Sequence, residues 1–191
     1  MNGWRMTAVA IACAGVLALA GCSKKQESAA AKSGSIGSLT GSAAGVKWGV
    51  PARWSAQGER PMRVVTYTIP VAEGDTEAAE CAVFYFGGGQ GGDVDANLNR
   101  WAGQFESSGA MAREEKQVGG MKITSVQIAG AYLAPSGPMM QSSGKKENFR
   151  LLGAIVDGPQ GSIFFKLTGP AKTVTAAEGE FSALVESLAK M

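Results

Sequence analysis

The pattern of apolar and polar positions predicts a strand and a helix at the centre of residues 46–191. Residues 81–86 are apolar on both alternating faces, which is typical of a central strand covered on both sides. A glycine-rich run follows, and in residues 93–105 the apolar positions recur at the helical period. The apolar stripe of this predicted helix consists of Val94, Leu98, Trp101, Ala102 and Phe105. We expect this strand and helix to form the core.

The start and the polar face of this helix are also predicted. Asp93 is a good N-cap, and Asp95 lies in the first turn, where a carboxylate opposes the positive end of the helix dipole. The side expected to face solvent consists of Asn97, Asn99, Arg100 and Gln104.

Three further segments are predicted to form strands and turns around this unit. Residues 62–70 alternate in period two, which predicts a strand with Val65, Tyr67 and Ile69 pointing inward. Two hairpins are expected after the helix; they join residues 114–118 to 121–133, and residues 149–157 to 162–170. Between the hairpins, a long loop is expected at residues 134–147.

The chain is predicted to end in a second amphipathic helix within residues 173–191. Thr175 and Glu178 have the spacing of a capping box at its start. Its buried stripe is expected to contain Ala177, Phe181, Leu184, Val185 and Leu188. Because successive strands are joined by short turns, the fold class is predicted to be α+β, with an antiparallel sheet flanked by the two helices.

The glycine run allows sharper interpretations that the neighbouring residues disfavour. Gly87, Gly89 and Gly92 satisfy the dinucleotide-binding spacing, but Asp93 and Asp95 would repel a pyrophosphate at the helix start. Asp93, Asp95 and Asn97 also mimic the first ligands of a calcium loop, and they are weak metal candidates. However, Leu98 replaces the required glycine and Gln104 the bidentate glutamate. A flexible turn followed by a capped helix is the favoured interpretation.

Composition removes the enzyme classes that depend on histidine and leaves carboxylate, lysine and serine chemistry open. The chain contains no histidine, which excludes Ser-His-Asp and Cys-His catalysis and imidazole acid–base steps. Cys81, within the predicted central strand, is expected to be a small buried hydrophobe. The acids Glu73, Asp75, Glu77 and Glu80 fall in a polar connection, where a charge run is normally solvated. We expect no catalytic residues and no cofactor.

Charge gives no support to nucleic-acid binding. Four of the 18 basic residues and one of the 16 acidic residues precede residue 46, so residues 46–191 carry a net charge of −1. No basic patch is visible along this part of the sequence. We therefore expect no nucleic-acid partner.

The first 45 residues are expected to target and tether the protein. After Arg5, residues 6–21 are uncharged, apolar or small, as in a signal peptide. The tetrapeptide Leu19-Ala20-Gly21-Cys22 resembles the lipobox of bacterial lipoproteins. The resemblance implies cleavage after residue 21 and a lipid on Cys22; an uncleaved anchor or an ordinary secretory signal are the alternatives. Ser23 favours an outer-membrane anchor facing the periplasm. Residues 22–45 are predicted to be a flexible linker, and residues 46–191 a single domain.

Several short motifs in residues 45–191 resemble the PsbP/Mog-type family. They are the opening Trp48-x-x-Pro51-x-x-Trp54, the central helix, the strand ending Gly130-Ala131-Tyr132, and FFKLTGP followed by FSALVESL. The resemblance implies an α/β/α sandwich and a non-enzymatic accessory module that docks on other proteins. It transfers no contact residues, because the family's binding positions cannot be matched to this chain.

The favoured function is therefore a lipid-anchored binding or assembly module of the bacterial envelope. Its partner is expected to be a protein, with Met139 and Met140 as candidate contact residues, because methionines adapt to partner surfaces. The alternative is a periplasmic carrier of a small ligand or metal. An enzyme is the least favoured class, since no pair of groups has a visible reason for shifted pKa values.

Overall fold

A computed structural model describes residues 34–106, 111–136 and 141–191 of the chain. The predicted signal peptide, the predicted lipid-attachment residue Cys22, and Met139 and Met140 lie outside the described residues. Among the residues that are described, no helix is long and apolar enough to cross a bilayer.

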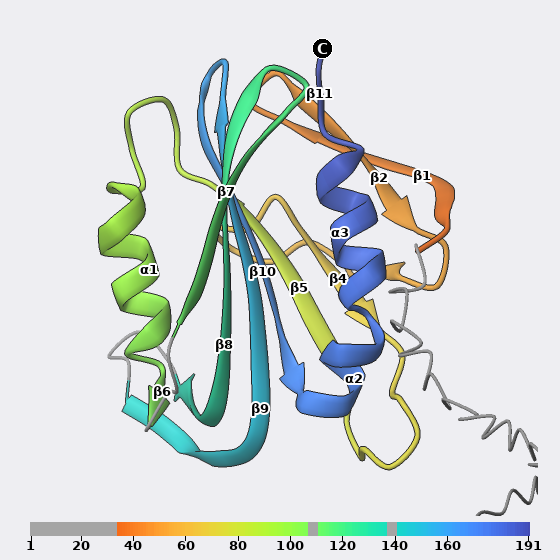
Figure 1. Cartoon of the computed structure of the whole chain (residues 1–191), viewed down its shortest axis with the longest axis vertical. Coiled ribbons are helices and arrows are strands. Elements are labelled where there is room, and N and C mark those ends of the chain that lie inside the picture. The colour runs from red at the N-terminus through yellow and green to blue at the C-terminus, as the bar shows by residue number, and fades with distance from the viewer. Residues whose placement is uncertain (1–33, 107–110, 137–140) are drawn as a thin grey trace, which may run out of the picture. The chain divides into compact units, whose positions relative to one another are not determined.

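An eight-stranded sheet is the centre of the fold, and all of its strand pairs are antiparallel (Figure 1). Its order is β3-β4-β5-β10-β9-β8-β6, with β7 pairing with β8 off this path. The strands are β3 (Ser55–Ala56), β4 (Val65–Ile69), β5 (Ala79–Tyr85), β6 (Phe105–Glu106), β7 (Ala112–Val118), β8 (Met121–Ser136), β9 (Gln141–Gly158) and β10 (Gly161–Pro170). The expected central strand β5 lies between β4 and β10, and both predicted hairpins are confirmed.

A second, three-stranded sheet combines the first two strands of the described chain with its last strand, and it corrects the predicted domain boundary. It has the order β1-β2-β11, with β1 (Ile36–Ala43), β2 (Val46–Pro51) and β11 (Ala189–Lys190). The predicted linker of residues 22–45 is therefore wrong in its last part, because residues 36–43 pair with β2. These residues are mostly small and polar, so no apolar alternation marks them. Backbone hydrogen bonds to β2 nevertheless hold them in a strand.

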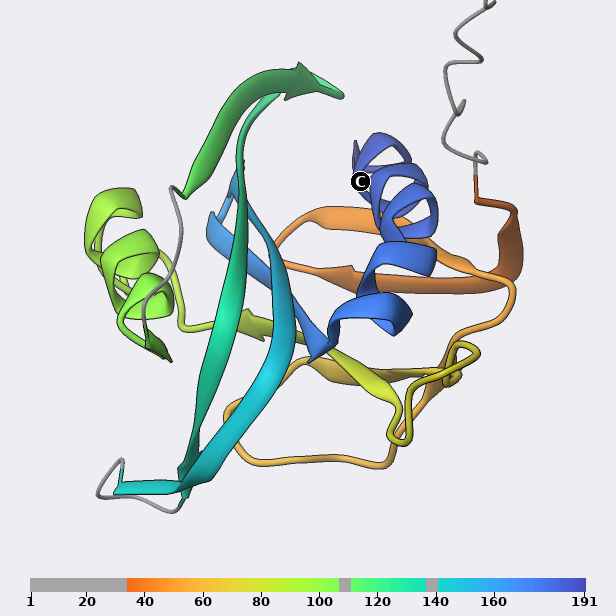
Figure 2. The same cartoon turned by 60° about the horizontal axis from the view of Figure 1, so that its bottom comes forward.

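Helices cover both faces of the large sheet (Figure 2). On one face, α1 (Val94–Ala102) packs Leu98 and Trp101 against apolar side chains of β8, β9 and β10. On the other face lie α2 (Ala171–Ala176) and α3 (Glu178–Glu186), together with the small sheet. The predicted α+β fold with a largely antiparallel sheet is confirmed. The helix-flanked sandwich is matched in part, since strands share the second outer layer.

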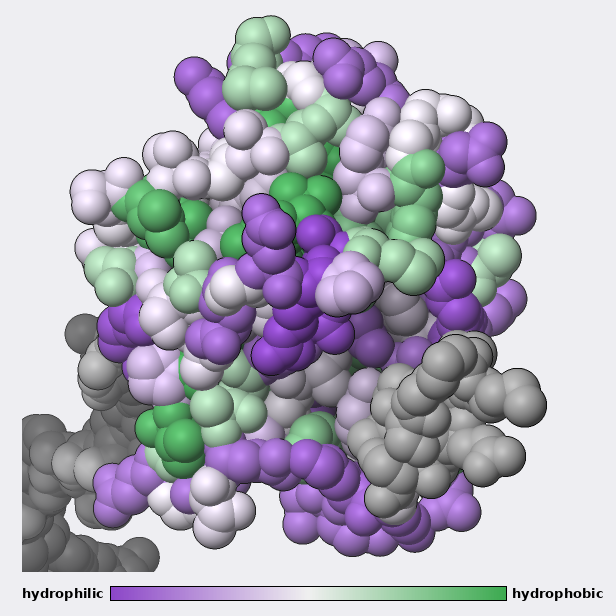
Figure 3. All heavy atoms as spheres, turned by 180° about the vertical axis from the view of Figure 1, so that it is seen from behind, coloured by the Kyte–Doolittle hydropathy of each residue, from purple (hydrophilic) through white to green (hydrophobic). Residues whose placement is uncertain are grey.

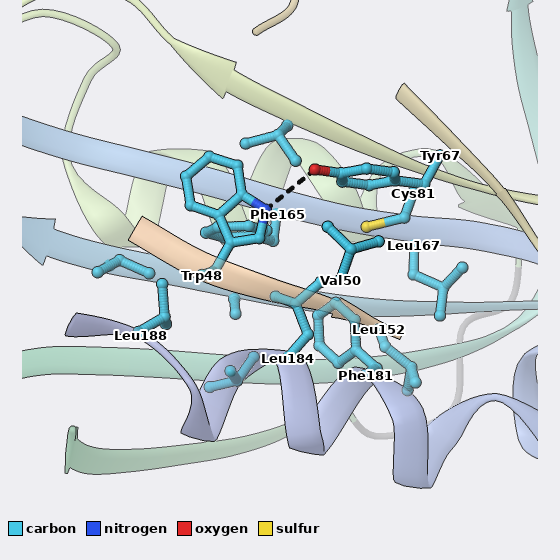
Figure 4. Packing of buried hydrophobic residues seen from close by; sticks show 14 of the residues in the cluster. Trp48, Val50, Tyr67, Cys81, Leu152, Phe165, Leu167, Phe181, Leu184 and Leu188 are labelled. Carbon is cyan, nitrogen blue, oxygen red and sulfur yellow. Dashed lines mark hydrogen bonds between the residues drawn. The ribbon is translucent and has the colours of Figure 1, made fainter. Parts of the chain in front are cut away.

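Trp48 on β2 joins the small sheet to the large one. Its indole N–H donates to the Tyr67 hydroxyl at 3.1 Å, and its ring meets Phe165 edge-on at 5.0 Å between centroids (Figure 4). Cys81 lies in the same cluster and is completely buried, as expected. Burial raises the pKa of the Cys81 thiol, which keeps it in the unreactive neutral form.

The C-terminal helix is divided and is not capped as predicted. Asp75 accepts hydrogen bonds from the backbone N–H and the hydroxyl of Thr173, both at 2.7 Å, in the first turn of α2. Thr175 and Glu178 instead both accept hydrogen bonds from Arg150 on β9, so the predicted capping box is wrong. The tertiary partners Asp75 and Arg150 outcompete the local motif. The predicted stripe is confirmed, because all its members are buried: Ala177, Phe181, Leu184, Val185 and Leu188.

The long loop predicted between the hairpins is also wrong. Strands β8 and β9 continue to pair through Pro135↔Ser142 and Ser136↔Gln141. Residues 134–147 contain few apolar positions, so their sequence resembles a loop. Strand pairing needs only backbone groups, and it extends the hairpin beyond the part that packs on the core.

Candidate functional site

The glycine turn before α1 is a structural turn rather than a converging cation site. Asp93 caps the helix as predicted, accepting from the Ala96 N–H at 2.7 Å, and Asp95 pairs with Arg113 at 2.7 Å. Asn97 is 1% exposed and donates to the Gly91 and Asp93 carbonyls, both at 2.8 Å, so its predicted solvent-facing position is wrong. No group of three or more metal-ligating side chains occurs in the described part of the chain.

The acids in the connection before β5 do not form a catalytic pair. Asp75 caps α2, and Glu77 pairs with Lys146 at 2.6 Å. Glu80 pairs with Arg60 at 3.0 Å and with Arg63 at 2.5 Å. Each of these three carboxylates has its own basic or backbone partner, which assigns them structural roles.

A hollow of about 130 Å³ opens on the α1 side of the large sheet. Its apolar walls are Phe84, Phe86, Trp101 and Phe164, and its polar lining is Arg100, Gln104 and Lys166. The alternation of a strand explains this placement. On β10, Ile163, Phe165 and Leu167 point into the other core, which leaves Phe164 and Lys166 on the hollow's side. We call this site the β5–β10 hollow.

Two glycines allow the aromatic walls to approach the sheet closely. A Cβ at Gly153 on β9 would lie 2.3 Å from the Trp101 ring. A Cβ at Gly91 would lie 2.9 Å from Phe86 and 3.0 Å from Phe164, and Gly91 also has a φ of +94°. The glycine turn therefore serves the hollow by shaping one of its sides.

Lys166 is the unusual side chain of the hollow. It is partly buried, and its ammonium group donates to Gln104 Oε1 at 2.5 Å and lies 5.6 Å from the Tyr132 ring centre. Burial, followed by the positive charges of Arg63 and Arg100, lowers the pKa of Lys166 to about 8. A lysine whose charged form is disfavoured in this way is a feature of functional sites.

In the described structure, Glu80 offsets only part of the positive charge around the hollow. Arg63 lies over the Phe84 ring at 5.6 Å and already shares Glu80 with Arg60. Lys166 and Arg100 form no ion pair with any carboxylate among the described residues. The face turned away from the viewer in Figure 1 gathers hydrophilic side chains at its middle, beside hydrophobic ones (Figure 3). An anion is the ligand that this charge favours.

Sequence reasoning missed this site. The sequence offered one signal, because Lys166 stands among Phe164, Phe165 and Leu167 in a largely apolar strand. A lysine is rarely buried unless a partner or a function requires it. Arg63, Arg100 and Gln104 come from a loop and from the end of α1, and only the tertiary structure brings them to Lys166.

The titration of Lys166 gives a testable pH dependence of stability. The unfolded lysine has the ordinary pKa of 10.5, so between about pH 8 and 10.5 the unfolded chain binds a proton that the folded chain has lost. The free energy of unfolding therefore rises with pH across that window. Below pH 8, the charged lysine lowers the free energy of unfolding by about 3 kcal/mol. Lys166→Met should be more stable than the wild type at pH 7, and the gap should close towards pH 10.5.

Urea unfolding at several pH values measures this gap. Cysteine and tyrosine side chains of the unfolded chain also titrate in this range, so the difference between the two proteins isolates Lys166. Lys172→Met, at an exposed position on α2, is the matched control and should show no such change. A gap that stays constant from pH 7 to 10.5 would show that Lys166 titrates normally.

Comparison with solved structures supports the expected PsbP-type fold, whereas the sequence comparisons found no match. No protein-family profile and no curated protein matches the sequence. Among solved structures, the chain is similar to the cyanobacterial PsbP protein (CyanoP) from Synechocystis sp. PCC 6803, with a TM-score of 0.50 and 14% sequence identity. The similarity covers 83% of this chain and 98% of that one. At this identity the likeness shows the fold, and the described domain therefore has a PsbP-type fold.

Proposed function

We propose that this protein is a lipid-anchored, non-enzymatic binding module of the bacterial envelope, which holds an anionic group of a partner protein in the β5–β10 hollow. The observation that carries the proposal is the pair of basic side chains, Lys166 and Arg100, that line an aromatic recess without an acidic partner in the described structure. The lining of the recess carries basic groups and no carboxylate, and Glu80, which also acts on Lys166, is already paired with Arg60 and Arg63. Such a recess is complementary to an anion.

The cost of keeping Lys166 supports a binding role. Placing an ammonium group beside two guanidinium groups in an apolar recess destabilises the folded state. A bound anion offsets that cost, because it restores the favourable environment of the charged lysine. Residues that weaken folding are concentrated at functional sites, where the ligand compensates for them.

Exposed apolar side chains next to Arg63 in the sequence support a protein as the partner. Met62 and Val64 flank Arg63 in the sequence and are 77% and 40% exposed. Methionine side chains adapt to partner surfaces, and apolar groups bordered by arginines are common in protein interfaces. Met139 and Met140 remain candidate contacts by the same reasoning.

The anchor is proposed from the sequence. Cleavage before Cys22 and lipid attachment to its thiol would leave a short tether of residues 23–35 before β1. Ser23 supports the outer membrane, with the domain facing the periplasm. The proposed tether is shorter than the linker expected from the sequence, because residues 36–43 form strand β1.

In-cell crosslinking followed by purification of the full chain tests this function. The wild type and Lys172→Met should recover the same envelope partner. Lys166→Met should lose it, and Cys22→Ser should reduce the recovery because the domain leaves the membrane. Equal recovery by Lys166→Met would move the contact away from the hollow, and no partner above background would contradict the binding role.

The alternative function is carriage of a free small ligand through the periplasm. The same hollow favours it, since about 130 Å³ accommodates a small anion with an apolar part. Recovery of a small molecule, and of no protein, with the purified chain would favour this alternative.

A further inference from the structure

We infer that the β5–β10 hollow recognises a carboxylate carried on an apolar body, and that it discriminates against phosphate. This inference rests on the proposed binding function and names the chemical class of the group that is bound. Three features of the hollow carry it: the number and kind of its donors, its position at the C-terminal end of α1, and its aromatic walls.

The free donors suit an anion with two oxygens. Gln104 accepts from Lys166 through Oε1, so its amide N–H groups are left for a ligand. Arg100 donates through Nη2 to Asn97 Oδ1, which orients the guanidinium and leaves its other N–H groups without a hydrogen bond among the described residues. Together with the ammonium group of Lys166, these donors can satisfy both oxygens of a carboxylate.

The negative end of α1 disfavours any anion at this position, and it disfavours a doubly charged phosphate about twice as strongly as a singly charged carboxylate. Helix α1 ends at Ala102. The Gly103 N–H donates to the Asn99 carbonyl at 2.9 Å, and the Gln104 N–H donates to the Trp101 carbonyl at 3.2 Å. Arg100 and Gln104 thus lie at the negative end of α1. Phosphate sites use the opposite end of a helix, which here begins at Asp93 with a carboxylate of its own.

The aromatic walls select an apolar body. Phe84 and Phe86 stack at 6.0 Å with an angle of 12° between their planes, and Phe86 lies 5.7 Å from Phe164. These rings, with Trp101, surround a volume that fits a small side chain and excludes a nucleotide or a sugar chain. The carboxylate of a free organic acid and the terminal carboxylate of a peptide share the required chemistry.

Binding should depend on the protonation of Lys166. The groups that face this lysine are Arg63 from the loop before β4, Glu80 on β5, Arg100 on α1 and Tyr132 on β8. Burial raises the pKa of Tyr132, which keeps its hydroxyl neutral, whereas burial and the neighbouring positive charges lower the pKa of Lys166 to about 8. Affinity is expected to fall about tenfold between pH 7 and pH 9.

Thermal melts of the full chain in a neutral detergent test the ligand class. The probes are phenylacetate, inorganic phosphate, and a tripeptide ending in phenylalanine with either a free or an amidated C-terminus. At tenfold above its Kd, phenylacetate should raise the melting temperature by about 3 to 6 °C, because it binds only the folded chain. Lys172→Met should keep this shift, and Lys166→Met should lose it.

The outcomes separate the ligand sources and the two proposals. A shift with the free-acid peptide but not with its amide supports a peptide carboxylate, and a shift with phenylacetate alone supports a free acid. An equal shift with phosphate, an unchanged shift in Lys166→Met, or no shift with any carboxylate would overturn the inference. If the melts overturn the carboxylate inference but partner crosslinking is still lost in Lys166→Met, the proposed binding function stands without that inference.

Discussion

Replacing Trp48 by alanine is expected to lower the free energy of unfolding by about 4 kcal/mol, the largest effect of any single substitution considered for this chain. The side chain is 1% exposed and fills the space between the two sheets, where it contacts Phe165 and donates to Tyr67. Alanine would leave a cavity that neither sheet can close, because both are held by their own ladders. Urea unfolding followed by circular dichroism measures the change.

Tyr67→Phe separates the packing of Trp48 from its hydrogen bond. This variant keeps the ring and removes the acceptor of the Trp48 N–H, so the indole nitrogen is left buried without its partner. The expected cost is about 1 to 2 kcal/mol. If Tyr67→Phe destabilised the domain as much as Trp48→Ala, packing between the sheets would not be the main contribution of Trp48.

Gly153→Ala is expected to destabilise the domain by about 2 to 3 kcal/mol, although it adds a single methyl group. The added Cβ would lie 2.3 Å from the Trp101 ring and 2.8 Å from a Val126 methyl, closer than atoms can approach. Trp101 must therefore move away from β9, and α1 moves with it. Thermal melts measure the loss of stability, and crosslinking measures the expected loss of partner capture, since Trp101 is a wall of the β5–β10 hollow.

The double variant Gly153→Ala/Trp101→Leu is the control for this contact. A smaller side chain at residue 101 makes room for the new methyl group. Trp101→Leu should therefore lower the free energy of unfolding less in the Gly153→Ala protein than in the wild type. Strictly additive effects would show that Gly153 and Trp101 do not depend on each other.

The elements with strong apolar patterns could be predicted from the sequence. The α1 stripe as far as Ala102 with its Asp93 cap, the doubly apolar strand β5 and the two hairpins are marked locally, by periodicity and turn residues. Phe105, predicted as the last member of the helical stripe, lies in β6 instead, because the chain leaves the helix after Ala102 and pairs with β8. Strand β1 and the far ends of β8 and β9 could not be predicted. Most of their residues are small or polar, so no apolar period marks them, and the strands that pair with them are not identified by local sequence.

Local motifs gave wrong expectations where a distant residue offered a better partner. Thr175 and Glu178 have capping-box spacing, yet both bind Arg150, and Asp75 caps α2 from 98 residues away in the sequence. Asn97 has the polarity of a surface residue, yet it is buried where it holds the glycine turn. Propensity acts over a few residues, so the tertiary partners decided these positions.

The sequence by itself determined the α+β class, the antiparallel pairing and the expectation of a binding module, because hydrophobic periodicity and the lack of histidine are properties of the chain alone. Only the tertiary structure decided where an anion could bind. Lys166, Arg100 and Gln104 come from two elements, and Arg63 from a third, so no linear spacing connects them. Their charges act together only when the sheet and α1 bring them to one partly buried recess lined by aromatic rings, where water screens them less than on an open surface.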